Sequence, residues 1–106
     1  MKRGDVYWAE QTGRRPVIVL SHDGFNQNPK WKSIIVVPIT SSALQAKRGP
    51  TVVALPAVAG LSKLSVAICH QVTTLDRAKL TKKIGALPFE ILIAVEEGLR
   101  AALDLD

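Results

Sequence analysis

Two short apolar runs, close together in the chain, constrain the fold more than any other feature of the sequence. Val17–Leu20 and Ile34–Ile39 are rich in β-branched residues and apolar throughout, which is typical of strands buried on both faces. Arg14-Arg15-Pro16 precedes the first run, and Thr40-Ser41-Ser42 follows the second. If the two runs are neighbouring strands of one sheet, Arg15 and Thr40 meet on one surface. A guanidinium beside a hydroxyl suits a phosphate-bearing ligand.

Weaker patterns predict the other strands. We expect strands at 5–9, 51–55, 65–72 and 83–87, a second strand that begins at Pro16, and a loop over 22–32. Pro38 lies near the end of the third strand, where it indicates an edge or a bulge.

Helical signals are confined to the second half of the chain. Asp76 is placed to N-cap a short turn over 77–80, and Pro88 suits the first turn of a helix. From Phe89 onward, one helical stripe is apolar and consists of Leu92, Val95, Leu99 and Ala102. The sequence therefore predicts an α+β fold: a single domain over 1–106 with a curled antiparallel sheet and a C-terminal helix that covers the open part of the core.

The positive charge of the chain is localised. Its net charge is +5, and residues 1–50 hold eight Lys/Arg against three Asp/Glu, whereas residues 51–106 hold six of each. A basic surface on one half is the electrostatic pattern expected for a nucleic acid partner. Simple solvation of surface lysines explains the same charge equally well.

Other features of the sequence narrow the class of protein. The only cysteine, Cys69, excludes an internal disulfide and is expected to be a small buried residue, and no Cys/His cluster has metal-ligand spacing. Met1-Lys2-Arg3 is not followed by the apolar stretch of a signal peptide, and no apolar run reaches membrane-spanning length. We expect a cytoplasmic protein that needs no metal or other cofactor.

An ordered set of short segments resembles the MazF/PemK toxins, the toxin halves of bacterial toxin–antitoxin pairs. The segments run in the family's order over nearly the whole chain: RGDVYW at 3–8, RPVIV at 15–19, PITS at 38–41, SV at 65–66 with Gln71, TLD at 74–76 and KIG at 83–85. The link at 10–13 is shorter than is usual in the family. His70 and Thr73 stand where many relatives have an acidic residue and an arginine.

The resemblance implies a small SH3-like antiparallel β-barrel with a C-terminal α-helix, usually as a homodimer. It implies a metal-independent endoribonuclease that cuts single-stranded RNA at short sequences and inhibits translation. It also implies a cognate antitoxin whose acidic tail blocks the RNA groove. The family's catalytic pair falls on Arg15 and Thr40.

These residue types suit RNA cleavage by the substrate's own 2′-oxygen. Arg15 offers a fork of donors to two phosphate oxygens, and Thr40 offers a hydroxyl donor. Arginine is a poor base at neutral pH because its guanidinium stays protonated, so we assign Arg15 to transition-state charge and leave the base open. His70 has a side chain suited to proton transfer. The alternative role for His70 is structural: a strand residue whose side chain packs on the same face as Val66, Ile68 and Val72.

Several further residues are candidates for RNA contacts. Arg14, Lys47 and Arg48 can bind phosphates, although the last two can equally be solvated. Asp23 and Asn26 can bind base edges or hold their loop by Asx turns. Trp31 can stack an unpaired base, whereas Trp8 is predicted to lie in the core. Ser41 and Gln71 complete the set of candidate RNA contacts.

Two alternatives belong to other functional classes. A CcdB-like toxin would have the same fold and act by binding gyrase, but that group lacks the Arg/Thr pairing and ends in an aromatic-glycine-isoleucine tail, unlike the LDLD at 103–106. A non-catalytic SH3-like nucleic-acid-binding module would fit the basic half and leave the Arg15/Thr40 pairing unused.

Overall fold

The structure is a computed structural model that describes residues 1–11, 13–41, 49–55, 60–61 and 64–106. These ranges contain the short helix α1 (Asp23–Asn26), the long helix α2 (Phe89–Leu103) and two 3₁₀ turns, η2 (Cys69–Gln71) and η3 (Arg77–Lys79). They also contain the strands β1 (Asp5–Gln11), β2 (Gly13–Val19), β3 (Ser33–Thr40), β4 (Val52–Leu55), β5 (Ser65–Ile68), β6 (Thr73–Asp76) and β7 (Leu80–Ala86).

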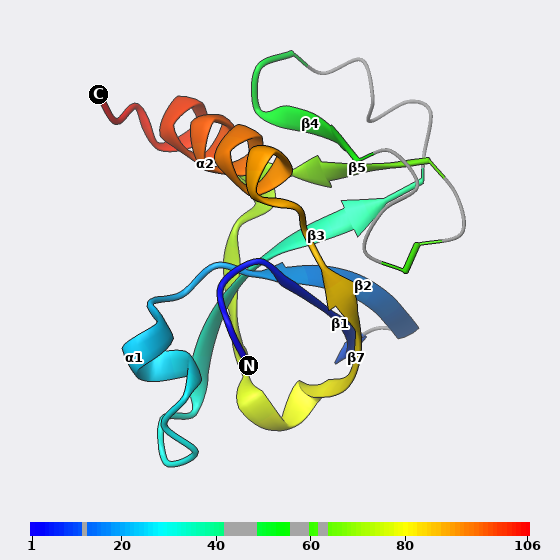
Figure 1. The fold of residues 1–106 in the computed structure, drawn as a ribbon, viewed down its shortest axis with the longest axis vertical. Coiled ribbons are helices and arrows are strands. Elements are labelled where there is room, and N and C mark those ends of the chain that lie inside the picture. The colour runs from blue at the N-terminus through cyan, green and yellow to red at the C-terminus, as the bar shows by residue number, and fades with distance from the viewer. Residues whose placement is uncertain (12, 42–48, 56–59, 62–63) are drawn as a thin grey trace.

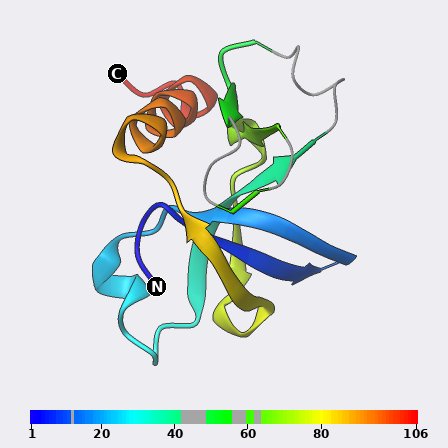
Figure 2. The ribbon, with the colours of Figure 1, turned by 45° about the vertical axis from the view of Figure 1, so that its right-hand side comes forward.

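The strands form one strongly curled antiparallel sheet. Their order is β4-β5-β3-β2-β1-β7, and β6 pairs with β3 as well. Helix α2 follows β7 and packs on β4 and η2, so it lies across the upper part of the sheet (Figures 1 and 2). The predicted α+β class, with a barrel-like antiparallel sheet and a C-terminal helix, is confirmed.

Strand β3 is central because it has three partners. One edge pairs with β2, while the other edge pairs with β6 over Ser33–Val36 and with β5 over Ile39–Thr40. Pro38 lies between those two segments, where β3 changes partner. The prediction of an edge or bulge at Pro38 is therefore wrong, because the strand is internal to the sheet and the missing N–H falls at a gap in its pairing.

Most of both faces of β2 and β3 is covered, as their apolar runs predict, although Ile35 of β3 is 41% exposed. Val17, Val19, Ile34 and Val36 belong to one buried cluster. The alternate residues, Ile18, Leu20, Val37 and Ile39, belong to a second cluster beneath α2. This double burial confirms that the two runs are central strands.

Helix α2 contacts the second cluster through the predicted stripe. Val95 is fully buried, and Leu92, Leu99 and Ala102 pack against the cluster. Gly98 lets the helix approach η2 closely, because a Cβ at that position would lie 2.6 Å from the Cys69 Sγ atom. Pro88 is the residue before the helix and not part of its first turn.

The predicted strand over 65–72 is wrong beyond Ile68. The chain turns at η2, where the Cys69 N–H donates to the Thr51 carbonyl at 2.9 Å, and then continues as β6. The turn moves the chain from the second half of β3 to its first half, so that one strand is covered by two successive partners.

Other boundaries also differ from the predictions, since β1 continues to Gln11 and β4 begins at Val52. Strand β2 begins at Gly13, before Pro16, and Pro16 pairs with Trp8 inside the strand. The predicted loop over 22–32 contains the short helix α1, and β7 begins at Leu80 and not at residue 83. Asp76 caps the turn η3 as expected, since its carboxylate accepts from the Ala78 N–H at 2.8 Å.

Candidate active site

A pocket of about 400 Å³ lies beside the tip of the β1–β2 hairpin. It is lined by residues from the hairpin, the end of β3, the start of β5 and the segment at 60–61: Trp8, Gly13, Arg14, Arg15, Pro16, Ile39, Thr40, Ser41, Gly60, Leu61 and Ser65. Two of these lining residues are arginines and none is acidic, so the pocket favours an anionic ligand.

The strand register explains why Arg15 and Thr40 come together. In the β2/β3 pairing, Val17 lies opposite Pro38. Continuing this antiparallel register by two residues places Arg15 opposite Thr40, with both side chains on the same face. Both residues line the pocket, as the two apolar runs suggested.

The Arg15 guanidinium is available to a ligand. Its residue is exposed, and no hydrogen bond or ion pair to its side chain occurs within the ranges that the structure describes. A planar fork of donors without a carboxylate partner can bind two oxygens of a phosphate.

Trp8 is a lining residue of the pocket, so its predicted place in the core is wrong. Its side chain is half-buried, and the central carbon of the Arg14 guanidinium lies 4.7 Å from the centre of its ring. Arg14 therefore holds a cation–π contact at the mouth of the pocket. Ser41 lines the same pocket, as do Ser65 and Gly60, which the sequence analysis did not single out.

His70 lies outside the pocket. Strand β5 begins at the pocket with Ser65, and His70 follows the other end of that strand. Cys69, the residue before His70, lies about 13 Å from Ser65 in the direction of the strand. Its Nδ1 atom is 2.6 Å from the Thr51 Oγ1 atom, and the residue is exposed. The packing alternative is wrong, because the strand ends before His70. The structure also does not bring His70 to Arg15 and Thr40.

The predicted site residues Asp23 and Asn26 hold the loop after β2. The Asp23 carboxylate accepts from the Arg3 N–H at 2.7 Å and from the Asn26 amide at 3.1 Å. The backbone hydrogen bond from Arg3 is the main cause of a lowered pKa at Asp23. Asn26 is 1% exposed, and its side chain bonds the hydroxyl and carbonyl of Ser21. These contacts match the loop-holding alternative and leave Asn26 no access to RNA.

Trp31 lies on this loop, between α1 and β3. Figure 1 shows α1 at the opposite end of β2 from the β1–β2 hairpin. Its ring stacks on Phe25 with centroids 4.2 Å apart, and both rings are about two-fifths exposed, at 40% and 42%. Gln71 is exposed in η2 and does not line the pocket. Lys47 and Arg48 fall outside the residues that the structure describes.

Cys69 is a buried core residue, as expected. Burial raises the pKa of its thiol to about 11, so the thiol stays neutral. In the described part of the chain, no group of three His, Cys, Asp or Glu side chains is placed to hold a metal ion. Among the helices described, none is long and apolar enough to span a membrane.

Comparisons with known proteins agree with this fold. Residues 2–103 match the family of PemK-like, MazF-like toxins of type II toxin–antitoxin systems. Endoribonuclease EndoA of Bacillus subtilis is 34% identical, over 99% of this chain and 96% of that protein. The structure of the Mycobacterium tuberculosis toxin MazF-mt6 superposes with a TM-score of 0.82 at 31% identity, covering 96% of this chain and 98% of the toxin.

One chain of a solved complex also resembles this protein. The MazE–MazF complex from Deinococcus radiodurans contains a chain that superposes with a TM-score of 0.80 at 29% identity, covering 100% of this chain and 97% of that one. The protein therefore belongs to the PemK/MazF family of toxins from type II toxin–antitoxin systems.

Proposed function

We propose that this protein is the toxin of a toxin–antitoxin pair and acts as an endoribonuclease on single-stranded RNA. The observation that carries the proposal is the pocket at the ends of β2 and β3, where the register places Arg15 opposite Thr40. Its relatives are endoribonucleases by name. The pocket residues supply the charge and hydrogen-bond donors that phosphate chemistry needs.

The reaction that fits these groups is attack by the 2′-oxygen of a ribose on the adjacent phosphorus. The new O2′–P bond forms as the P–O5′ bond breaks, which gives a 2′,3′-cyclic phosphate and a 5′-hydroxyl. The 2′ proton leaves, and the 5′-oxygen gains a proton. Arg15 binds the non-bridging oxygens as charge builds on them and can protonate the leaving oxygen, while Thr40 donates a hydrogen bond. No base is assigned, because His70 lies outside the pocket.

The remaining pocket residues bind the substrate in this proposal. Arg14 and Ser41 contact the RNA beside the reacting linkage, and Lys47 and Arg48 remain candidates for phosphate contacts. A cognate antitoxin with an acidic segment would compete for the same basic pocket, and MazE occupies the partner role for the Deinococcus MazF. We further propose that the protein acts as a homodimer in the cytoplasm, where its RNA substrates are found.

Cleavage of a mixed pool of single-stranded RNA in EDTA tests the proposal. We expect short-sequence-specific cuts that leave 2′,3′-cyclic phosphate and 5′-hydroxyl ends. RNA that is bound but stays intact with pure, folded protein would favour the non-catalytic binding module. RNA that is neither bound nor cut would favour a protein target, as in the CcdB-like alternative.

A further inference from the structure

A row of side chains on the floor of the pocket continues to the edge of the sheet. Trp8 pairs with Pro16 across β1 and β2, and the β2/β3 register continued by one residue places Pro16 opposite Ile39. Directly paired residues share a face, so these three side chains form one cross-strand row, on the face opposite to that of Arg15 and Thr40, and all three residues line the pocket. On the other side of Trp8, the same row is completed by Lys82 of β7.

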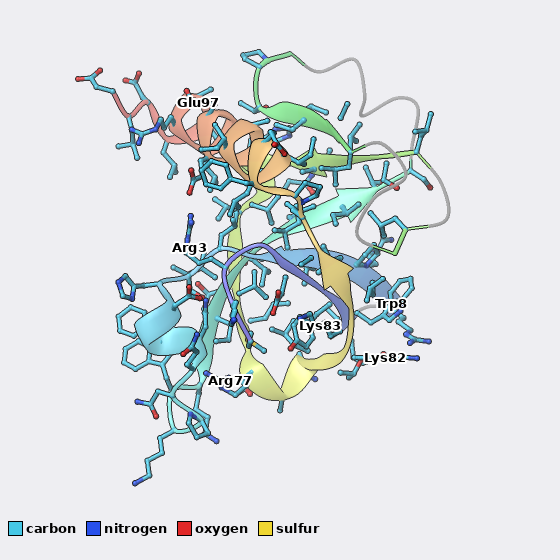
Figure 3. The ribbon with its side chains drawn as sticks, viewed as in Figure 1. Arg3, Trp8, Arg77, Lys82, Lys83 and Glu97 are labelled. Atoms are coloured by element: carbon cyan, nitrogen blue, oxygen red, sulfur yellow. The ribbon has the colours of Figure 1, made fainter. Side chains whose placement is uncertain are left out.

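The neighbouring lysine shows which face Lys82 occupies. Lys83 pairs with Tyr7, and its ammonium lies 3.5 Å from the carboxylate of Asp5, which is 4% exposed. Successive strand residues point to opposite faces, so Lys82 points away from Asp5, toward the side of Trp8. In Figure 3, Lys82 and Trp8 lie at the same side of the molecule, whereas Lys83 points inward.

Lys82 is also free for a ligand. It is exposed on β7, which pairs only with β1 among the strands described, and the described residues contain no carboxylate within ion-pair distance of its ammonium. Trp8 thus lies between two cations, Arg14 on β2 and Lys82 on β7. Glu10 lies two residues after Trp8 in β1, on the same face and nearer the hairpin tip, opposite Arg14. It forms no ion pair among the described residues.

We propose that Lys82 is a further RNA-binding residue. It binds a backbone phosphate of an RNA chain that crosses the floor of the pocket in the direction of β7. The inference rests on the proposed endoribonuclease function. Pro16 and Trp8 are half-buried and offer apolar surface to a nucleobase, whereas Ile39 is 3% exposed and belongs to the core. An ammonium directly beyond Trp8 suits the next phosphate. The pocket residue Gly60 lies directly against β7. A Cβ at Gly60 would lie 2.6 Å from Ile84, which is two positions after Lys82.

Lys82→Ala tests the proposal against a matched control, Lys30→Ala. Lys30 is an exposed lysine on the loop at the opposite end of β2, and its removal changes the net charge equally. The probe is a short single-stranded RNA that contains one mapped cut site and cannot reach from the pocket to the loop at 22–32, together with the same RNA carrying 2′-deoxyribose at the cut nucleotide. Binding of the uncleavable RNA is measured at several salt concentrations.

We expect Lys82→Ala to weaken binding roughly fivefold and to lower the slope of log affinity against log salt by about 0.7, the value for one phosphate contact on a single strand. The KM for the cleavable RNA should rise while kcat stays unchanged. Lys30→Ala should leave both quantities within error of the unaltered protein.

An unchanged affinity and salt slope for Lys82→Ala would overturn the proposal, as would equal effects of the two substitutions. So would an unchanged RNA affinity with weakened binding of an acidic peptide, which would assign Lys82 to a protein partner. Failure of the proposed function has a different signature, because the unaltered protein would then leave the all-ribose RNA uncut.

Discussion

The two ends of β2 use arginine in opposite ways. At the loop end, the Arg77 guanidinium donates four hydrogen bonds of 2.8–2.9 Å to the carbonyls of Phe25, Asn26, Asn28 and Trp31. At the hairpin end, Arg15 lines the pocket and is exposed, with no such partner among the described residues. Figure 3 shows Arg77 turned toward the loop around α1.

The difference separates a structural arginine from one available to a ligand. An arginine whose donors are saturated by backbone carbonyls stabilises the fold and has little left for a substrate. An exposed arginine beside a hydroxyl contributes little to folding and can bind an oxyanion. Removing each side chain should therefore affect different measurements.

The largest effect is expected for Arg15→Ala and Thr40→Ala on RNA cleavage. Each removes a donor to the developing charge, so kcat should fall by about a hundredfold or more, which corresponds to ~3 kcal/mol of barrier. The melting temperature should hardly change, because the residues lie at strand ends by the pocket. Initial cleavage rates and thermal melts measure the two quantities. Undiminished cleavage by either variant would contradict its assignment.

Arg77→Ala should act in the opposite sense. It removes four hydrogen bonds, of which those to Asn26 and Trp31 go to carbonyls with no backbone donor among the described residues, whereas the Phe25 and Asn28 carbonyls keep the N–H groups of Asn28 and Trp31. The free energy of unfolding should therefore fall by about 2–3 kcal/mol, while kcat at a temperature where the variant is folded should be unchanged. Urea unfolding and cleavage assays measure these effects. Arg100→Ala is the matched control, since its side chain is exposed on α2, and it should cost less than about 0.5 kcal/mol.

Trp31 tests whether the loop end also binds RNA. Its exposed ring can stack a base, although about 13 Å of strand separates Arg15 from the end of β2 where this loop begins. We expect Trp31→Ala to weaken binding of long single-stranded RNA by about 1 kcal/mol and to leave cleavage of a short RNA unchanged. Filter binding with RNAs of increasing length measures this. An equal affinity at every length would confine RNA binding to the pocket end.

The smallest effect concerns pH and the same loop. The Arg3 N–H bond, above other causes, holds the pKa of Asp23 below its ordinary value of 3.8. The ionised carboxylate therefore stabilises the fold above pH 3.8, and this contribution is lost as the pH falls through the folded-state pKa. Unfolding should become easier in acid, and Asp23→Asn should reduce that dependence. The exposed residue Asp104, changed to Asn, should leave it unaltered.

Local sequence patterns determined the parts of the fold that depend on neighbouring residues. The apolar stripe from Leu92 to Ala102 predicts α2 because helix periodicity brings those side chains to one face. The runs at 17–20 and 34–39 predict central strands because they are apolar on both faces. With the chemistry at their ends, they also indicate that Arg15 and Thr40 belong to one site.

Only the tertiary structure decided which strand lies beside which. The segment 65–72 is continuously β-like in sequence, but β3 requires two partners in succession, so the chain turns at Cys69 and carries His70 away from the pocket. Trp8 looks like a core residue in sequence and lines the pocket, because its row continues from Pro16 to an edge strand. Register joins residues far apart in the chain, and no local pattern encodes those pairings.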